Sequence, residues 1–109
     1  MSEDCIFCKI VSGEIPSKFL YEDDQVVAFR DIHPLAPVHI LVIPKKHIPT
    51  VADLPVGDPT LGLLADHANR LAKEEGIADK GYRLMVNCGK DGGQMVYHLH
   101  LHLLGGRKL

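Results

Sequence analysis

The chain has 109 residues and a formal net charge of −2, and its 46% hydrophobic and 24% charged residues are ordinary for a globular protein. This predicts a single domain, residues 1–109, with a small core. There is no basic excess for binding nucleic acid, and no apolar run reaches the ~18 residues of a membrane span. The acidic N-terminus lacks the basic region of a signal peptide, so a cytoplasmic location is expected.

The stretch from Asp4 to Gly13 predicts a short helix, with Asp4 as its candidate N-cap and Gly13 as its candidate stop. It carries Cys5 and Cys8, and the third cysteine, Cys88, is expected in the core. An odd number of cysteines does not indicate a disulfide framework, and a reducing compartment is therefore expected.

Three strands are predicted next. Residues 18–24 and 26–31 are short apolar runs joined by a tight acidic turn. Residues 33–37 must form a loop, because their two prolines cannot donate to a strand ladder. Residues 38–45 are a continuous run of branched apolar residues, which is typical of a central buried strand.

A long helix is predicted after Asp58 and Pro59, a cap residue followed by proline in the first turn, and Gly76 is placed to end it. His67 is expected on its surface. Its apolar residues recur at helical spacing and form one stripe: Leu61, Leu64, Ala65, Ala68, Leu71 and Ala72.

Two more strands are predicted at residues 82–88 and 95–104, with a glycine-rich loop between them at residues 89–94. Because two pairs of strands have short links, antiparallel pairing is favoured. The prediction is an α+β domain: a five-stranded antiparallel sheet with one short helix and one long helix, the long helix packed on a face of the sheet.

The last predicted strand contains His98, His100 and His102 alternating with leucines. Side chains of a strand alternate between its faces, so the histidines share one face and the leucines the other, which belongs on the helix. Three-way chelation of one metal by the histidines is strained, because the outer two Cα atoms are about 13 Å apart in a strand. An exposed row of histidines is unusual for a strand.

A phosphate site is the favoured alternative. A neutral imidazole can attack phosphorus while protonated neighbours hold its oxygens, and histidine offers both states near its ordinary pKa of ~6.5. The glycines of residues 89–94 allow backbone N–H groups to turn toward an anion. By itself this loop is also consistent with a plain turn.

The run HLHLHLL, with IFCKI and EIP near the start and VVAFRDIHPLAPVHILVIPKKHI in the middle, resembles the histidine triad (HIT) superfamily. It is most similar to the Hint branch of nucleotide-binding nucleoside phosphoramidate hydrolases. The resemblance implies a HIT-like fold, a homodimer with a ten-stranded sheet, and hydrolysis of purine nucleoside phosphoramidates without a catalytic cofactor.

The resemblance assigns the catalytic residues. His100 matches the nucleophile that attacks the α-phosphorus and forms a nucleotidyl-histidine intermediate. The carbonyl of His98 holds Nδ1–H of His100, His102 bonds the phosphate, and His39 is the fourth histidine of the site.

It also assigns nucleotide contacts. Asp31 matches the acid that accepts the ribose hydroxyls, and Asn87 lies near the phosphate and ribose. Four residues of the glycine-rich segment are expected at the nucleotide: Gly93, Gln94, Met95 and Val96. Six apolar residues match the slot around the base, although core packing is the stronger explanation of most of them from the sequence alone: Ile6, Phe7, Ile10, Ile15, Phe29 and Ile32.

Met95 departs from the family pattern, which often has serine or threonine there, and methionine cannot assist a leaving group with a useful hydrogen bond. Two other functions stay open, and Met95 is the feature that keeps the second of them open. One is a dinucleoside polyphosphate hydrolase or nucleotidyl transferase of a neighbouring branch, and the other is a nucleotide-binding or zinc-stabilised scaffold with vestigial catalysis.

Some members of the wider superfamily bind structural zinc. Their ligands match Cys5, Cys8, His47 and His98 here, a common ligand set for a closed tetrahedral site. The alternative is that both cysteines are buried apolar residues and that His47 lies on the surface. The resemblance leaves these two possibilities about even.

Overall fold

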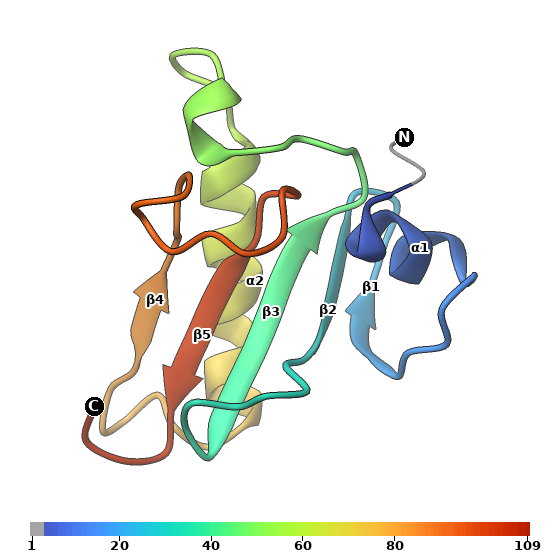
Figure 1. Ribbon diagram of the computed structural model, residues 1–109. Helices are drawn as coiled ribbons and strands as arrows, with labels where there is room; N and C mark the ends of the chain where they lie inside the picture. The colour runs from blue at the N-terminus through green and yellow to red at the C-terminus, as the bar shows by residue number, and fades with distance from the viewer. Residues whose placement is uncertain (1–3) are drawn as a thin grey trace.

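The structure is a computed structural model that describes residues 4–109. Its five strands form one antiparallel sheet in the order β1-β2-β3-β5-β4, and Figure 1 shows the long helix α2 behind the sheet and the short helix α1 in front of β2. The predicted α+β architecture is confirmed. The elements are α1 Ile6–Ser12, β1 Phe19–Glu22, β2 Val26–Arg30, β3 Val38–Pro44, the 3₁₀ turn η1 Val51–Asp53, α2 Thr60–Glu74, β4 Arg83–Met85 and β5 Leu101–Gly105.

The two faces of the sheet bury separate apolar clusters. β3 is the central strand, as predicted, and its residues alternate between them: Ile40 and Val42 pack toward α2, whereas Leu41 and Ile43 pack toward α1. The leucines between the histidines all belong to the α2 cluster, which confirms their predicted face: Leu99, Leu101 and Leu103.

The first helix begins one residue later than its predicted cap implies. Cys5, and not Asp4, is the N-cap of α1, and its Sγ accepts the N–H of Cys8 at 3.3 Å. The predicted stop at Gly13 is confirmed, since Gly13 takes the left-handed conformation (φ 84°) that glycine adopts without strain. This cap brings both cysteines inside the molecule.

The last strand is shorter than predicted. Only Leu101–Gly105 pair with β3, so His98 and His100 lie before the strand and not in it. The ladder ends there because Pro44 has no N–H to donate, and Leu99 N–H instead donates to Ile48 O at 2.6 Å. The fourth strand is also shorter than predicted, at Arg83–Met85, and pairs with residues Leu104 to His102 of β5.

The long helix lies where it was predicted, but it begins at Thr60 with Pro59, and not Asp58, as its N-cap; the Asp58 carboxylate accepts Thr60 N–H at 2.8 Å. No helix within residues 4–109 has the length and apolar character needed to cross a membrane. One prediction about the core is wrong: Cys88 is exposed, because the chain has left β4 and entered the loop by that point.

Candidate active site between two histidine groups

The sheet register places the fourth histidine beside the third of the run. Leu41 of β3 lies opposite His102 of β5, so His39, two residues along, is a diagonal neighbour on the same face. The two rings meet with 2.9 Å between His39 Nε2 and His102 Nδ1. All four histidines of the predicted site are buried, each at most 9% exposed, which excludes a row of solvent-facing side chains.

His100 has a defined tautomer. Its Nδ1 lies 2.7 Å from the carbonyl oxygen of His98. A carbonyl can only accept, so Nδ1 carries the proton and Nε2 keeps its lone pair. Phe7 packs edge-on against the ring with centroids 5.1 Å apart. An oriented neutral imidazole with a basic Nε2 is what a nucleophile requires.

The proton positions on His39 and His102 follow from one backbone group. Leu35 N–H donates to His39 Nδ1 at 3.0 Å, so His39 carries its proton on Nε2. Nε2–H then donates to His102 Nδ1, which leaves the proton of His102 on its own Nε2. Among the described residues, His102 Nε2 is the buried side-chain nitrogen without a hydrogen-bond partner. The relay ends in an unused donor, as needed to bind an anionic oxygen.

Burial keeps these rings neutral. It lowers the pKa of His102 to about 4, with the neighbouring His100 and His39 adding to the effect. Burial also lowers the pKa values of His39, His98 and His100, and the Asp31 carboxylate partly opposes this for His39 and His100. The neutral rings of His39, His100 and His102 therefore offer a ligand one lone pair, at His100 Nε2, and one N–H, at His102 Nε2.

His98 faces the two cysteines. Its Nε2 lies 2.7 Å from Pro44 O, which fixes the proton there and leaves the Nδ1 lone pair free to bind. That Nδ1 is 3.4 Å from Cys5 Sγ and 3.5 Å from Cys8 Sγ, and His47 Nδ1 is 3.2 Å from Cys8 Sγ. These four residues are called the Cys–His group below.

The Cys–His group fits a zinc ion. Its four ligand atoms lie within 4.8 Å of one another. In a tetrahedral site with Zn–S near 2.3 Å and Zn–N near 2.1 Å, a sulfur and a nitrogen are about 3.5 Å apart, close to the separations found here. His98 presents the lone pair that a ligand needs.

Asp31, His39 and His102, the Asp–His group below, also bring three potential ligand atoms within 4.8 Å. This group does not fit a metal, because His39 Nε2 carries a proton as long as Leu35 N–H occupies Nδ1. The three histidines of the run are thus divided between two groups with His100 between them, and they do not converge on one ion.

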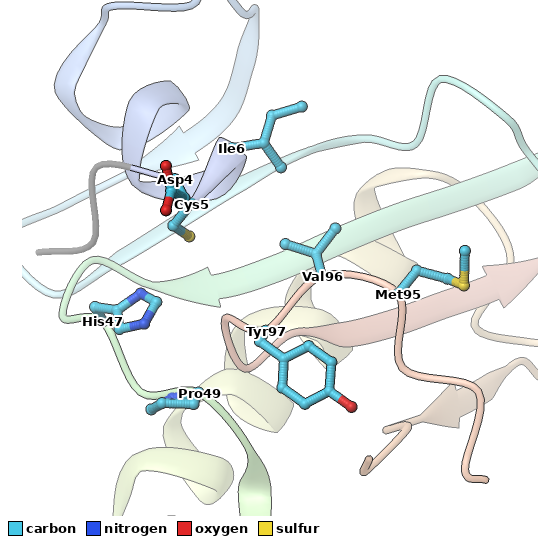
Figure 2. A pocket seen from close by; sticks show the side chains of 8 residues that line it. All are labelled: Asp4, Cys5, Ile6, His47, Pro49, Met95, Val96 and Tyr97. Atoms are coloured by element: carbon cyan, nitrogen blue, oxygen red, sulfur yellow. The ribbon is translucent and has the colours of Figure 1, made fainter. Parts of the chain in front are cut away.

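A pocket of about 380 Å³ opens beside the Cys–His group. Figure 2 shows Cys5, the N-cap of α1, and His47 of the loop after β3 on its walls, with Val96 and Tyr97 on the facing loop. Met95 also lines it and is 89% exposed. Two residues of the Cys–His group, Cys5 and His47, therefore line an open pocket.

The Asp31 side chain is 21% exposed at the edge of the site. One oxygen accepts His33 N–H at 2.8 Å, and the other lies 3.4 Å from His39 Nε2. Each carboxylate oxygen accepts two bonds, so capacity for hydroxyl donors remains. Asn87 donates to Gly92 O at 2.7 Å and holds the glycine-rich loop by this bond.

Hydrogen bonds within the glycine-rich loop occupy more of its backbone N–H groups than the sequence predicts. Gly89 N–H donates to the Gln94 side chain, Gly93 N–H to Lys90 O, and Gln94 N–H to Gly89 O. The amide nitrogen of the buried Gln94 side chain donates to the carbonyls of Pro49 and Val96. Gln94 therefore braces the loop from inside, while Gly93 and Met95 stay exposed at its surface.

The predicted base slot divides into two sets. Phe7, Ile10 and Phe29 are buried in the cluster under α1, with Ile15 and Val96 packed against it. Ile6 and Ile32 are 45% and 84% exposed. Leu35 N–H and Pro44 O, which face ring nitrogens of His39 and His98, could not be found from the sequence, because backbone atoms leave no residue pattern.

A model of the HIT domain family matches residues 12–109. A purine nucleoside phosphoramidase of Escherichia coli is 54% identical over 100% of this chain and 92% of its own length. An uncharacterized HIT-like protein of Synechococcus elongatus is 52% identical over 100% and 96%. The solved structure of a histidine triad protein from Clostridium difficile superposes with a TM-score of 0.95 at 51% identity, covering 100% of this chain and 96% of that one.

Proposed function

The chain belongs to the HIT domain family, and from that premise we propose that it is a purine nucleoside phosphoramidate hydrolase that cleaves the P–N bond. Identity of 54% over the whole chain to a purine nucleoside phosphoramidase supports this activity. The observation that carries the mechanism is His100, whose Nδ1–H is held by the His98 carbonyl at 2.7 Å so that Nε2 is the basic atom.

In the first step, the lone pair of His100 Nε2 attacks the α-phosphorus and the P–N bond breaks, which gives a nucleotidyl-histidine and an amine. The leaving nitrogen takes its proton from water, since methionine at position 95 has none to give and the N–H of the neutral His102 ring stays on the phosphoryl group. In the second step, water attacks the phosphorus, the bond to His100 breaks, and the nucleoside monophosphate leaves. The N–H of His102, otherwise unpaired, donates to a phosphoryl oxygen in both steps.

The nucleotide contacts are part of the same proposal. Asp31 accepts the ribose hydroxyls with its remaining capacity, and the loop at Gly93 borders the phosphate. The exposed Ile6 and Ile32 contact the base above the buried Phe7. Catalysis by these residues needs no cofactor.

A fluorogenic adenosine phosphoramidate tests the function directly. Turnover with an acid-labile nucleotidyl adduct on the wild type is expected, and a dinucleoside polyphosphate should be a poorer substrate. Preference for the polyphosphate would indicate a neighbouring HIT branch instead. Nucleotide binding without turnover of either compound would indicate a scaffold, the alternative that the exposed Met95 keeps open.

We further propose that Cys5, Cys8, His47 and His98 hold a structural zinc ion. The separations between their ligand atoms and the tautomer of His98 support it. Such an ion ties α1 to the segments around His47 and His98 and contributes to folding. The ring of His98 then serves the metal while its carbonyl serves His100.

We also propose an isologous homodimer. β4 is an edge strand, and its Leu84 is 37% exposed, so it has both backbone groups and apolar surface available for pairing. Pairing across a two-fold axis would join two sheets into one of ten strands. Sedimentation at micromolar concentration is expected to give a dimer, and a monomer would contradict it.

A further inference from the structure

The last residues of the chain contact the loop before β3. Arg107 Nη2 donates to Leu35 O at 2.8 Å, and Nη1 donates to Lys108 O at 2.8 Å. Gly106 allows this approach. It has φ 93°, and a Cβ there would lie 2.9 Å from Pro37 Cβ. The C-terminal segment therefore lies closely against the loop, in a conformation that other residues rarely adopt.

Other contacts hold this loop on both sides of Leu35. Asp31 N–H donates to His39 O at 3.0 Å at its base, His33 N–H donates to Asp31 Oδ1 at 2.8 Å, and Ala36 is buried. The side chain of Leu35 is 63% exposed, so apolar packing contributes little to the orientation of its backbone. Two hydrogen bonds hold the Leu35 backbone itself, one at the carbonyl from Arg107 and one at the N–H to His39 Nδ1.

The N–H of Leu35 is the origin of the proton relay to the active site. It keeps His39 Nδ1 an acceptor, which places the His39 proton on Nε2 and the His102 proton on the unpaired Nε2. If Leu35 N–H moves away, His39 can carry its proton on Nδ1. His102 then loses its donor partner and can present a lone pair to the phosphate, which repels an anionic oxygen.

We propose that Arg107 is a positioning residue: by holding Leu35 O, it keeps Leu35 N–H on His39 and so maintains His102 as a hydrogen-bond donor to the phosphoryl group. The inference rests on the proposed function for its kinetic consequence. Its structural part concerns the tautomers of two histidines and is measurable without any substrate. Arg107 contacts neither the phosphate site nor the reacting atoms.

The test compares Arg107→Ala with Arg107→Lys and two controls. Lys108→Ala removes the neighbouring cation, whose backbone carbonyl alone contacts Arg107. Arg30→Ala removes an arginine that pairs with Glu75 on the surface. Ring-nitrogen NMR reports the protonated nitrogen of His39 and His102 in each protein. Steady-state kinetics with the phosphoramidate reports kcat and KM separately.

In Arg107→Ala, the protons of His39 and His102 should shift partly from Nε2 to Nδ1. The value of kcat should fall about three- to tenfold, the effect of one hydrogen bond of ordinary strength, with KM nearly unchanged. Arg107→Lys should restore much of both, since lysine still donates to a carbonyl, and both controls should match the wild type.

Wild-type tautomers in a folded Arg107→Ala protein would overturn the proposal, whatever its activity. If Arg107→Ala fails to fold, Arg107→Met decides in its place, because methionine keeps a long unbranched side chain but has no donor for Leu35 O. Loss of the relay tautomers or of kcat relative to Lys108→Ala supports the role of Arg107, and identity to the wild type in both overturns it. A wild type that does not hydrolyse phosphoramidates would refute the proposed function alone, because the NMR comparison still decides the role of Arg107.

Discussion

The Cys–His group and the Asp–His group flank His100 and look alike as sets of potential ligands. Each brings its ligand atoms within 4.8 Å, and each includes one histidine of the triad run. They differ in where the ring protons lie. His98 donates Nε2–H to Pro44 O and turns a lone pair to the sulfurs, whereas His39 accepts from Leu35 N–H and turns a proton to His102.

The difference shows how the backbone assigns chemistry to histidines. A carbonyl facing one ring nitrogen leaves the other as a base or ligand, and an N–H facing it leaves the other as a donor. His98 and His100 both face carbonyls, and His39 faces an N–H. The lone pair of His98 in the Cys–His group thus suits a cation, and the N–H of His102 in the Asp–His group suits an anion. The lone pair of His100, between the two groups, suits electrophilic phosphorus.

The largest effect is expected from removing the ring between the groups. His100→Ala eliminates the attacking Nε2, and turnover should fall on the order of 10⁴-fold or more, as for other catalytic nucleophiles. Nucleotide binding and the fold should remain, since Phe7 loses only one edge contact. His67→Ala makes the same change outside both groups and should leave turnover near normal. Comparable rates in the two variants would refute covalent catalysis by His100.

Metal content separates the two groups. We expect about one zinc per chain, bound by the Cys–His group, in protein purified without a histidine tag. Cys8→Ser should lose the ion, and with it roughly 4 kcal/mol of stability when free zinc exceeds the dissociation constant about 1,000-fold.

Asp31→Ala is the matched control for this experiment, because it removes a ligand of the Asp–His group and should keep the zinc. If the wild-type protein contains no zinc after growth in zinc-supplemented medium, both cysteines are apolar core residues and not metal ligands. Loss of zinc in Asp31→Ala would reverse the assignment of the two groups.

Much of this arrangement could be predicted from the sequence, and the parts that could not be predicted have a common cause. Branched apolar runs and helical spacing predicted β3 and α2, and the alternating leucines predicted the face of β5 that packs on α2. The ends of β5 could not be predicted, because they depend on Pro44 failing to pair with a segment more than 50 residues away.

The site shows the same division. Side-chain types and spacing indicated the triad and, through the family resemblance, the four residues that the structure gathers in the Cys–His group. The proton positions could not be predicted, since they depend on Leu35 N–H and Pro44 O, groups that every sequence contains. The exposed Cys88 was misplaced because β4 ends earlier than its apolar pattern indicates.

Acid should destabilise the protein through the Asp–His group. Burial lowers the pKa of His102 to about 4, whereas an unfolded histidine titrates near 6.5. Between these values the unfolded chain binds a proton that the folded protein does not, so stability falls as pH falls from about 6.5 to about 4. The loss is on the order of 3 kcal/mol for this ring.

Urea unfolding at several pH values measures this effect. His102→Gln keeps an N–H donor but cannot titrate, so its stability should decline less over the same range, although other buried histidines still contribute. Equal declines in the wild type and His102→Gln would show that His102 is not held neutral by burial.

The smallest effect concerns Asp31, the acid of the Asp–His group, which we propose contacts the nucleotide and not a metal. If Asp31 accepts the ribose hydroxyls, a 2′,3′-dideoxy nucleotide should bind more weakly than its ribose counterpart by about 1.5–3 kcal/mol, the value of hydrogen bonds to a charged acceptor. Asp31→Ala should bind both nucleotides equally, while Asp79→Ala, which removes an exposed acid after α2, should keep the discrimination. Calorimetric titration of the two nucleotides into the three proteins measures it. Because Asp31 also lies 3.4 Å from His39 Nε2, its removal should weaken the binding of both nucleotides somewhat. The quantity to compare is therefore the ratio of the two affinities in each protein. Equal binding of both nucleotides by the wild type would leave Asp31 only its bonds to His33 and His39, as a support for the loop and the histidine relay.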